Sequence, residues 1–316
     1  MKRVAIPAGI LVLLALVPQF ALVIPYVFNG AINTPGTLQL LALCLVFGGL
    51  AVTYDLLFGF TGLLSFGHAL YFAVGVYLVA MAITKWHWGF WVALAFAQAG
   101  AVLALKDPHH WTHGEEGLGA DYTKLPAGLV GIFNTKHLYW IALGYVACVV
   151  AIVQWAVNSS PGHVWQAIRE NELRVEVLGL RPYTYKLMSF VLASFLATAG
   201  GVVYVLLLGG ATPEVTSANF TLTLLVMVVI GGTGTRWGAL LGGVLYTWAN
   251  ERLGDASSSH AVSSLPSLLR TPLQQPLFVL GVLFILVVFF VPGGLARFGG
   301  VRRPRTLQRL QEAMQR

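Results

Sequence analysis

Long apolar runs dominate this chain and constrain its fold more than any other feature. A helix needs about 20 apolar residues to cross a bilayer, and the longest runs are Ala5–Phe28, Leu38–Phe58, Leu63–Ile83, Gly89–Leu105, Leu138–Val157, Leu187–Leu208 and Leu277–Val291. Charged residues make up 10% of the 316 positions, whereas a soluble domain carries about a quarter. A water-facing surface cannot be built from so few charges. The sequence therefore predicts an all-α fold, a polytopic transmembrane helical bundle of about eight apolar segments.

Two further apolar segments, Phe220–Ile230 and Ala239–Ala249, are too short for a comfortable crossing, and they flank the glycine-rich stretch Gly231–Gly238. This pattern is typical of discontinuous or re-entrant helices. Non-helical backbone at membrane depth is tolerated only where it faces protein or a water-filled path. We therefore expect this break to lie on a translocation pathway, through Gly231, Gly232, Gly234 and Arg236. The alternative is a tight cytoplasmic turn between two short helices.

A second break, Gly59–His68, interrupts two of the long runs with glycines, hydroxyls and a histidine. An ionisable residue inside the membrane is costly and indicates function by default. We expect Gly62, Ser65, Gly67 and His68 to belong to the pathway as well. The alternative for His68 is a histidine at a helix end that bonds a nearby carbonyl. Small residues four apart, in the pairs Gly238/Gly242 and Ala197/Gly201, predict close helix packing without any substrate.

The basic residues indicate which ends of the chain stay in the cytoplasm. Lys2 and Arg3 precede the first apolar run, and residues 297–316 form a tail rich in arginine. Cytoplasmic segments retain such residues, so we expect both ends inside, residues 1–296 as one membrane domain, and an uncleaved first helix. A cleavable signal peptide is the alternative for the first run.

A polar stretch from Lys106 to His137 contains the cluster His109–Glu116. The cluster lacks the HExxH spacing of a zinc site on a helix, so we predict no metal and no cofactor. An intramembrane metal-dependent enzyme remains the alternative from another functional class. Cys44 and Cys148 both lie in apolar runs and are interpreted as small core residues.

The polar stretch Asn158–Lys186 predicts a short amphipathic helix outside the bilayer. Pro161 and Gly162 open it, Gly179 and Pro182 close it, and Val164, Ile168, Val175 and Leu178 share one face. A helix that lies on lipid would be strongly basic, whereas these charges nearly balance. A mixed-charge helix with a narrow apolar ridge favours a groove on another protein.

Four segments, taken together, resemble one known family. The first is Ala167–Glu172 (AIRENE), followed by Leu178–Leu180 (LGL) and Tyr185–Leu187 (YKL). Gly62–His68 (GLLSFGH) resembles the family's GQLSLGH segment, Gly114–Leu118 (GEEGL) its GGxxGL element, and Met227–Thr235 (MVVIGGTGT) its MVVLGGxGS stretch. Together they resemble the LivM-like branched-chain amino-acid ABC transporter permeases.

The resemblance implies a permease subunit in the inner, or plasma, membrane without catalytic activity of its own. A second similar permease, two cytoplasmic ATPases and an extracytoplasmic solute-binding protein would complete the importer. No GxxxxGK[ST] phosphate loop occurs in the chain. The segment that contacts the ATPase would comprise Ala167, Ile168, Arg169, Glu170, Asn171, Glu172 and Gly179. The implied solutes are branched-chain amino acids. Urea or short amides are alternatives, and a structural scaffold is another.

The number of crossings leaves one conflict. With the N-terminus inside, four spans return the chain to the cytoplasm at Lys106, and the span Leu138–Val157 would place the Asn158–Lys186 loop outside. Counting backward from the basic tail places the same loop inside. The family has one more apolar helix between the segments that match Leu105 and Gly114. Either the chain is a shortened version of the family's fold, or a break such as Gly59–Gly67 changes the number of crossings by one.

Overall fold

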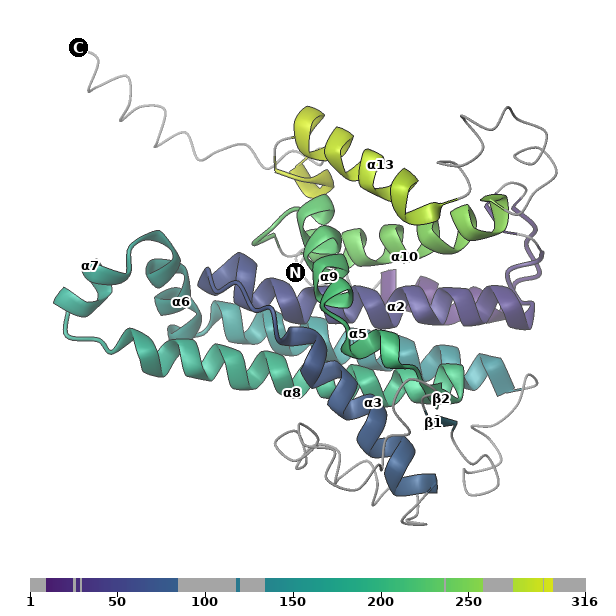
Figure 1. Ribbon diagram of the computed structural model, residues 1–316, viewed down its shortest axis with the longest axis horizontal. Coiled ribbons are helices and arrows are strands. Elements are labelled where there is room, and N and C mark those ends of the chain that lie inside the picture. The colour runs from purple at the N-terminus through teal and green to yellow at the C-terminus, as the bar shows by residue number, and fades with distance from the viewer. Residues whose placement is uncertain are drawn as a thin grey trace.

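The computed structural model describes residues 10–24, 27–28, 30–84, 118–119, 134–235, 237–257, 275–291 and 293–297. These residues form a helical bundle (Figure 1), which confirms the predicted all-α fold. The main helices are α2 (Pro35–Asp55), α3 (His68–Thr84), α5 (Thr135–Asn158), α6 (Ser160–Glu170), α7 (Glu172–Val177), α8 (Pro182–Leu208), α9 (Ala218–Gly231), α10 (Gly238–Ser257) and α13 (Pro276–Phe290). The strands β1 (Leu118–Gly119) and β2 (Gly210–Ala211) pair in antiparallel fashion.

Three of the described helices are long and apolar enough to cross a membrane. They are Pro35–Thr61, Thr135–Asn158 and Pro182–Leu208, with mean hydropathies of 2.1, 2.0 and 2.2. Shorter apolar helices cover Ile10–Gln19, His68–Ile83, Asn219–Gly231 and Phe278–Phe290. The chain is therefore a multi-pass membrane protein built largely from the predicted segments.

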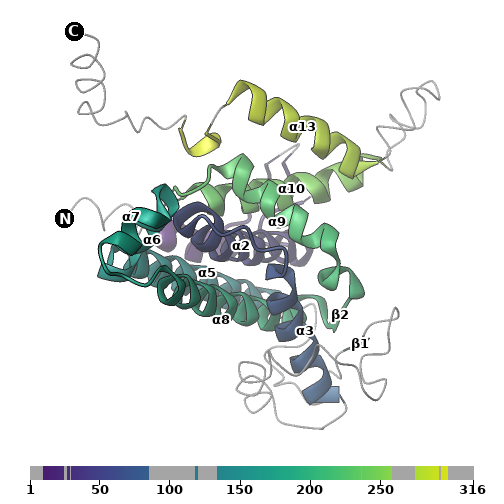
Figure 2. The same cartoon turned by 60° about the vertical axis from the view of Figure 1, so that its left-hand side comes forward.

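Helix α2 forms the centre of the bundle and packs against α5, α8, α9 and α10. Figure 2 shows α13 lying over α10, on the face away from α5 and α8. Glycines permit the closest approaches, since a Cβ on Gly243 would meet the Gly48 Cα at 2.7 Å, and one on Gly242 would meet the Met227 carbonyl oxygen at 2.0 Å. A Cβ on Gly201 would meet the Phe72 carbonyl oxygen at 2.2 Å. The packing role predicted for Gly242 and Gly201 is confirmed.

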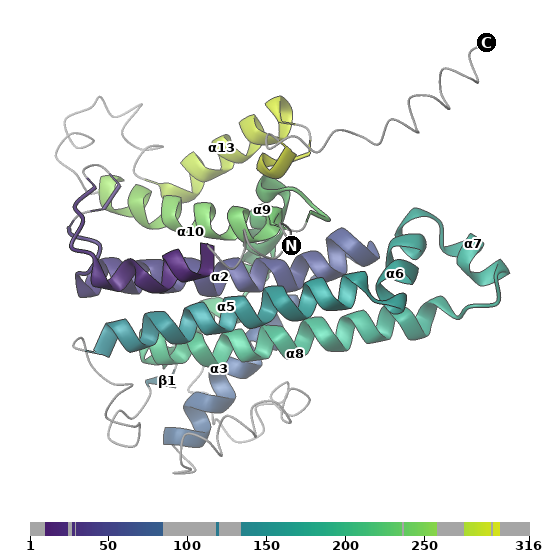
Figure 3. The same cartoon turned by 180° about the vertical axis from the view of Figure 1, so that it is seen from behind.

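The bundle has two ends, defined here as the loop end, which holds α6 and α7, and the strand end, which holds β1 and β2 (Figures 1 and 3). Helices α2, α5 and α13 run toward the loop end, and α8 and α10 run away from it. Helix α3 begins beside α2 and runs toward β1 and β2, which it contacts. Thr84 and Leu118 thus lie toward the same end. The turn after α13 packs on Gly232, and Gly234 of the same glycine break lies at Arg169 of α6, so the end of α13 and the α6–α7 loop lie toward the same end, as the backward count of crossings requires.

Two predicted segments have different lengths in the structure. The first apolar run is predicted to be helical through Phe28, but the helix ends in a 3-10 turn at Val17–Gln19, and residues 20–24 are not helical. Pro18 in that turn has no N–H to continue the helical bonding. Helix α10 is predicted to end near Ala249, but it continues to Ser257. Its last turns are polar, and Arg252 Nε donates a hydrogen bond of 2.7 Å to the Val27 carbonyl oxygen.

Candidate functional site

The first glycine break begins inside α2. After Asp55 the helix continues as a π-helix, Leu56–Thr61, and ends at Gly62 in the left-handed conformation with a φ of 78°. Residues 62–65 have no regular structure and residues 66–67 form a turn, after which α3 starts at His68. Gly62 and Gly67 are exposed, and Ser65 is half-buried. Short π-helical segments inside α-helices are frequently found at functional sites, so this segment is a site candidate by its backbone alone.

His68 is fully buried at the start of α3. Its Nε2 lies 2.9 Å from Thr53 Oγ1. Because the Thr53 hydroxyl donates to the Leu50 carbonyl oxygen at 2.7 Å, it accepts from His68, and Nε2 carries the proton. The lone pair on Nδ1 has no partner among the described residues. His68 therefore packs between helices in this conformation. Its hydrogen-bond partner is the Thr53 hydroxyl, whereas the alternative interpretation expected a backbone carbonyl.

The second glycine break is a tight turn that packs against its neighbours. Gly232 and Gly234 have φ values of 110° and 67°. A Cβ on Gly232 would meet the Gly293 carbonyl oxygen at 2.7 Å, so the turn after α13 covers this break. Thr235 lines the same cavity as Asn158, the last residue of α5. The break therefore lies level with the end of α5, toward the loop end.

The Asn158–Lys186 stretch forms two helices, which corrects the single helix expected from sequence. Asn171 is extended, with a φ of −163° and a ψ of 106°, and its side chain accepts from the Arg174 N–H at 3.1 Å as the cap of α7. The break places Glu170 and Arg174 on different helices, so these residues do not form an ion pair one turn apart on a single helix. Glu172 instead pairs with Lys186 at 2.6 Å.

The two helices of this loop expose different surfaces. Gly162, Trp165 and Ile168 of α6 are buried, and the Trp165 Nε1–H donates to the Tyr185 carbonyl oxygen at 2.8 Å. Ala167, Glu170 and Glu172 are exposed. On and after α7, Leu173, Val177 and Leu178 are 71%, 88% and 78% exposed. These three residues are called the α7 tip below. Leu178 is predicted to share one face with Ile168 and Val175, but it is exposed whereas those two residues are buried within the chain.

Arg169 joins this loop to both glycine breaks. Its Nη1 donates a hydrogen bond to the Gly59 carbonyl oxygen in the π-helix. A Cβ on Gly62 would lie 3.2 Å from the Arg169 Cγ, and one on Gly234 would lie 2.5 Å from its Nη1. The α6–α7 loop and the two glycine breaks, which the sequence marks as separate features, thus meet at the Arg169 side chain.

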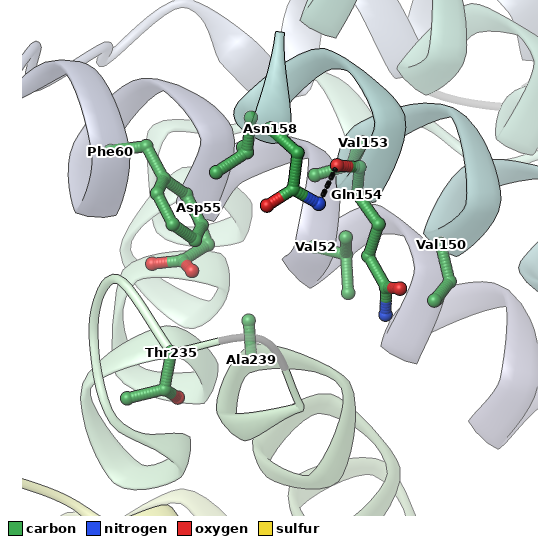
Figure 4. Close-up of a pocket in the computed structure, with 10 residues that line it drawn as sticks. Val52, Asp55, Phe60, Val150, Val153, Gln154, Asn158, Thr235 and Ala239 are labelled. Carbon is green, nitrogen blue, oxygen red and sulfur yellow. Dashed lines mark hydrogen bonds between the residues drawn. The ribbon is translucent and has the colours of Figure 1, made fainter. Parts of the chain in front are cut away.

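Asp55 completes the junction and is not among the residues predicted from sequence. It is 1% exposed, and its Oδ1 accepts from the Gly234 N–H at 2.8 Å. The signal was present, because Asp55 is the one acidic residue before Asp107 and it lies within an apolar run. Figure 4 shows Asp55 beside Phe60, Thr235 and Ala239 at a cavity of about 20 Å³ between α2, α5 and α10. That volume holds about one water molecule.

The structure leaves some predicted residues apart or undescribed. Gly62 and Gly234 meet at Arg169, whereas His68 contacts Thr53 within the bundle. Arg236 and the cluster His109–Glu116 lie outside the described residues. Within the described part of the chain, no group of three or more potential metal ligands comes together.

Comparison with known proteins identifies the family. A family model for the permease component of branched-chain amino acid transport systems matches residues 112–288. The high-affinity branched-chain amino acid transport system permease protein LivM of Escherichia coli K12 is 23% identical over 82% of this chain and 70% of its own length.

Other relatives cover less of the chain. The probable branched-chain amino acid transport permease protein LivM of Methanocaldococcus jannaschii is 25% identical over 49% of this chain and 45% of its own. The autoinducer 2 import system permease protein LsrC of E. coli O9:H4 is 25% identical over 57% of this chain and 49% of its own. No solved structure matches the chain significantly. The apolar bundle and the matched span together show that this chain belongs to the family of branched-chain amino acid transport system permease components.

Proposed function

We propose that this chain is a membrane-spanning permease subunit of an ATP-binding-cassette importer for branched-chain amino acids or related small polar solutes. It would pair with a second similar permease, two cytoplasmic ATPase subunits and an extracytoplasmic solute-binding protein. The α6–α7 loop and the tail from residue 297 would lie in the cytoplasm, and residues 1–296 would form the membrane domain. The family assignment and the names of the relatives support this proposal.

The observation that carries the proposal is the junction at Arg169. A loop can couple an external ATPase to helices in the membrane only if it contacts something that can move. Arg169 lies on α6 and touches Gly59 and Gly234, which belong to the two backbone interruptions of the bundle. Movement of α6 is therefore delivered to both glycine breaks at once. We place the solute path beside these breaks, at Gly62, Ser65, Gly67 and Gly231–Gly238.

The α7 tip supports an ATPase-docking role for the loop. Helix α7 projects beyond the ends of the bundle helices (Figure 1), and the three apolar side chains of the tip are highly exposed. Asn171, Leu173, Arg174, Val177 and Leu178 also line an open hollow there. An exposed apolar cluster rimmed by polar residues marks a protein or membrane contact, and the nearly balanced charge of this stretch favours a protein. The docking surface therefore centres on α7, next to the Ala167–Glu172 segment to which the resemblance assigns it.

Uptake in vesicles tests the proposal. The chain is purified with its partner permease, ATPases and binding protein, reconstituted, and supplied with labelled leucine, urea or acetamide. We expect ATP-dependent uptake of leucine that competes with isoleucine and valine. Uptake of urea or acetamide but not of leucine would support an importer and would contradict branched-chain amino acids as its solutes. ATP-independent uptake, or no co-purifying ATPase, would refute the importer.

The Val177→Asp variant tests the docking surface in the same assembly. A charge in an apolar contact is not desolvated without cost, so we expect weaker retention of the ATPase on the purified permease. Glu176→Gln, on the same helix and exposed, is the matched variant and should retain the ATPase.

A further inference from the structure

The contact between Asp55 and Gly234 is the longest-range hydrogen bond at the junction, joining residues 179 positions apart. Asp55 lies on α2, the central helix, and Gly234 lies in the turn between α9 and α10. Its N–H is a donor that the turn itself does not use in any described backbone bond. The carboxylate therefore bonds this turn directly to α2, in addition to the packing of α9 and α10 on that helix.

Gly59 makes the contact geometrically feasible. A Cβ on Gly59 would lie 1.9 Å from the Asp55 Oδ1 and 2.3 Å from the Gly234 nitrogen. Both atoms of the hydrogen bond thus occupy the space that any other residue at position 59 would fill. The Gly59 carbonyl oxygen, on the same residue, accepts from Arg169. One residue of the π-helix therefore touches the acceptor, the donor and the coupling arginine.

We propose that Asp55 is a positioning residue of transport: its carboxylate latches the α9–α10 turn to α2, and movement of Arg169 on α6 opens and closes this latch. The inference rests on the proposed function, since it concerns what the coupling loop moves. Asp55 touches no solute in this role. It sets the position of the second glycine break, and the adjacent cavity of about 20 Å³ gives its carboxyl group somewhere to turn when the hydrogen bond breaks.

Hydrogen exchange of the peptide that covers residues 231–238 tests the latch on the wild-type assembly. We expect the Gly234 amide to be protected without nucleotide and to exchange at least tenfold faster when the ATPases are trapped with ATP and vanadate. Equal protection in the two states would overturn the latch. The measurement needs no variant, so it does not depend on whether a substitution folds.

Substitutions separate positioning from simple stability. Removing the Asp55 carboxylate leaves the Gly234 N–H without its acceptor. The free-energy cost of such a loss corresponds to about a tenfold change in an equilibrium constant. Asp55→Leu should therefore lower the number of solute molecules moved per ATP about tenfold and leave the Gly234 amide unprotected at rest. Asp55→Asn keeps an acceptor oxygen and should restore both values. An Asp55→Asn variant as defective as Asp55→Leu, or an Asp55→Leu variant with normal coupling, would contradict the proposal.

Gly59→Ala tests the same contact from the other residue, because its Cβ would displace Asp55. We expect it to reproduce the exchange pattern of Asp55→Leu. Gly144→Ala, in α5 with no atom within 4 Å of the added Cβ, is the matched control. Thr247→Val is the second control, since Thr247 bonds only the Gly243 carbonyl of its own helix among the described contacts. If wild-type vesicles show no ATP-driven uptake, the proposed function fails, while resting-state exchange still decides whether Asp55 holds the turn.

Discussion

Gly179 ends α7 in the left-handed conformation, with a φ of 82° and no neighbouring atom within 4 Å of the position that a Cβ would take. The Gly179 N–H donates to the Glu176 carbonyl oxygen at 2.9 Å, and the Leu180 N–H to that of Val175 at 3.3 Å. This is the glycine-terminated helix end that the sequence predicted. An added methyl group here acts through backbone conformation alone, because there is no neighbour to strike.

Gly179→Val should therefore uncouple the loop while the chain still inserts. The left-handed conformation costs a non-glycine residue about 1–2 kcal/mol and is worst for a β-branched one. We expect loss of solute-stimulated ATPase activity at normal membrane yield. Gly179→Asn, which tolerates this conformation, should keep most of the stimulation. Unchanged stimulation in the valine variant would show that the geometry of this helix end does not matter for coupling.

Gly232 combines a positive φ with a close neighbour, so alanine there meets two obstacles. The added methyl would lie 2.7 Å from the Gly293 carbonyl oxygen, at a φ of 110°. We expect Gly232→Ala to cause a strong transport defect in a chain that still folds, measured as leucine uptake against protein yield. Gly36→Ala, with no atom near its Cβ, serves for comparison. Nearly normal uptake in the Gly232→Ala variant would show that this glycine break is a tight turn without a role in the translocation pathway.

At the scale of elements, Asn171 separates α6 from α7 and lets them expose different faces. Its side chain is the N-cap of α7, and loss of such a cap costs about 1 kcal/mol. We expect Asn171→Ala to unwind the six-residue α7 and to reduce ATPase retention, with Asn171→Asp close to wild type. Circular dichroism cannot resolve so short a helix, so exchange of the α7 amides is the measurement. If the α7 amides of the Asn171→Ala variant were as protected from exchange as those of the wild type, the Asn171 cap would not be needed for α7.

The elements that sequence predicted well are those set by local chemistry. The apolar runs became α2, α5 and α8 because a segment that crosses a membrane must bond its backbone internally. Gly179 and the small residues of α10 behave as expected for the same local reasons. The break at Asn171 was not predicted, although asparagine favours caps over helix interiors, because the apolar spacing from Val164 to Leu178 continues through it. The junction of Arg169, Gly59 and Asp55 depends on contacts between residues more than a hundred positions apart, which no local pattern encodes.

At the scale of the whole molecule, the α6–α7 loop and the strand end lie at opposite ends of the bundle (Figure 3). This arrangement yields a labelling test of sidedness. In a chain whose Cys44 and Cys148 are replaced by alanine, Ser160→Cys should resist impermeant thiol reagents in intact cells. Glu214→Cys, an exposed position in the 3-10 turn that follows β2, should react readily. Ready labelling at Ser160 would overturn both the topology and the coupling role.

The partner of Asp55 also determines when the membrane domain can be completed. An ionisable residue in an inserting helix costs a few kcal/mol, and α2 carries Asp55 close to its loop end, where that cost is smallest. Its hydrogen-bond donor is synthesised 179 residues later, which at ordinary translation rates is a delay of roughly 10–40 s. Throughout that interval the Asp55 carboxyl group lacks the donor that it has in the finished fold.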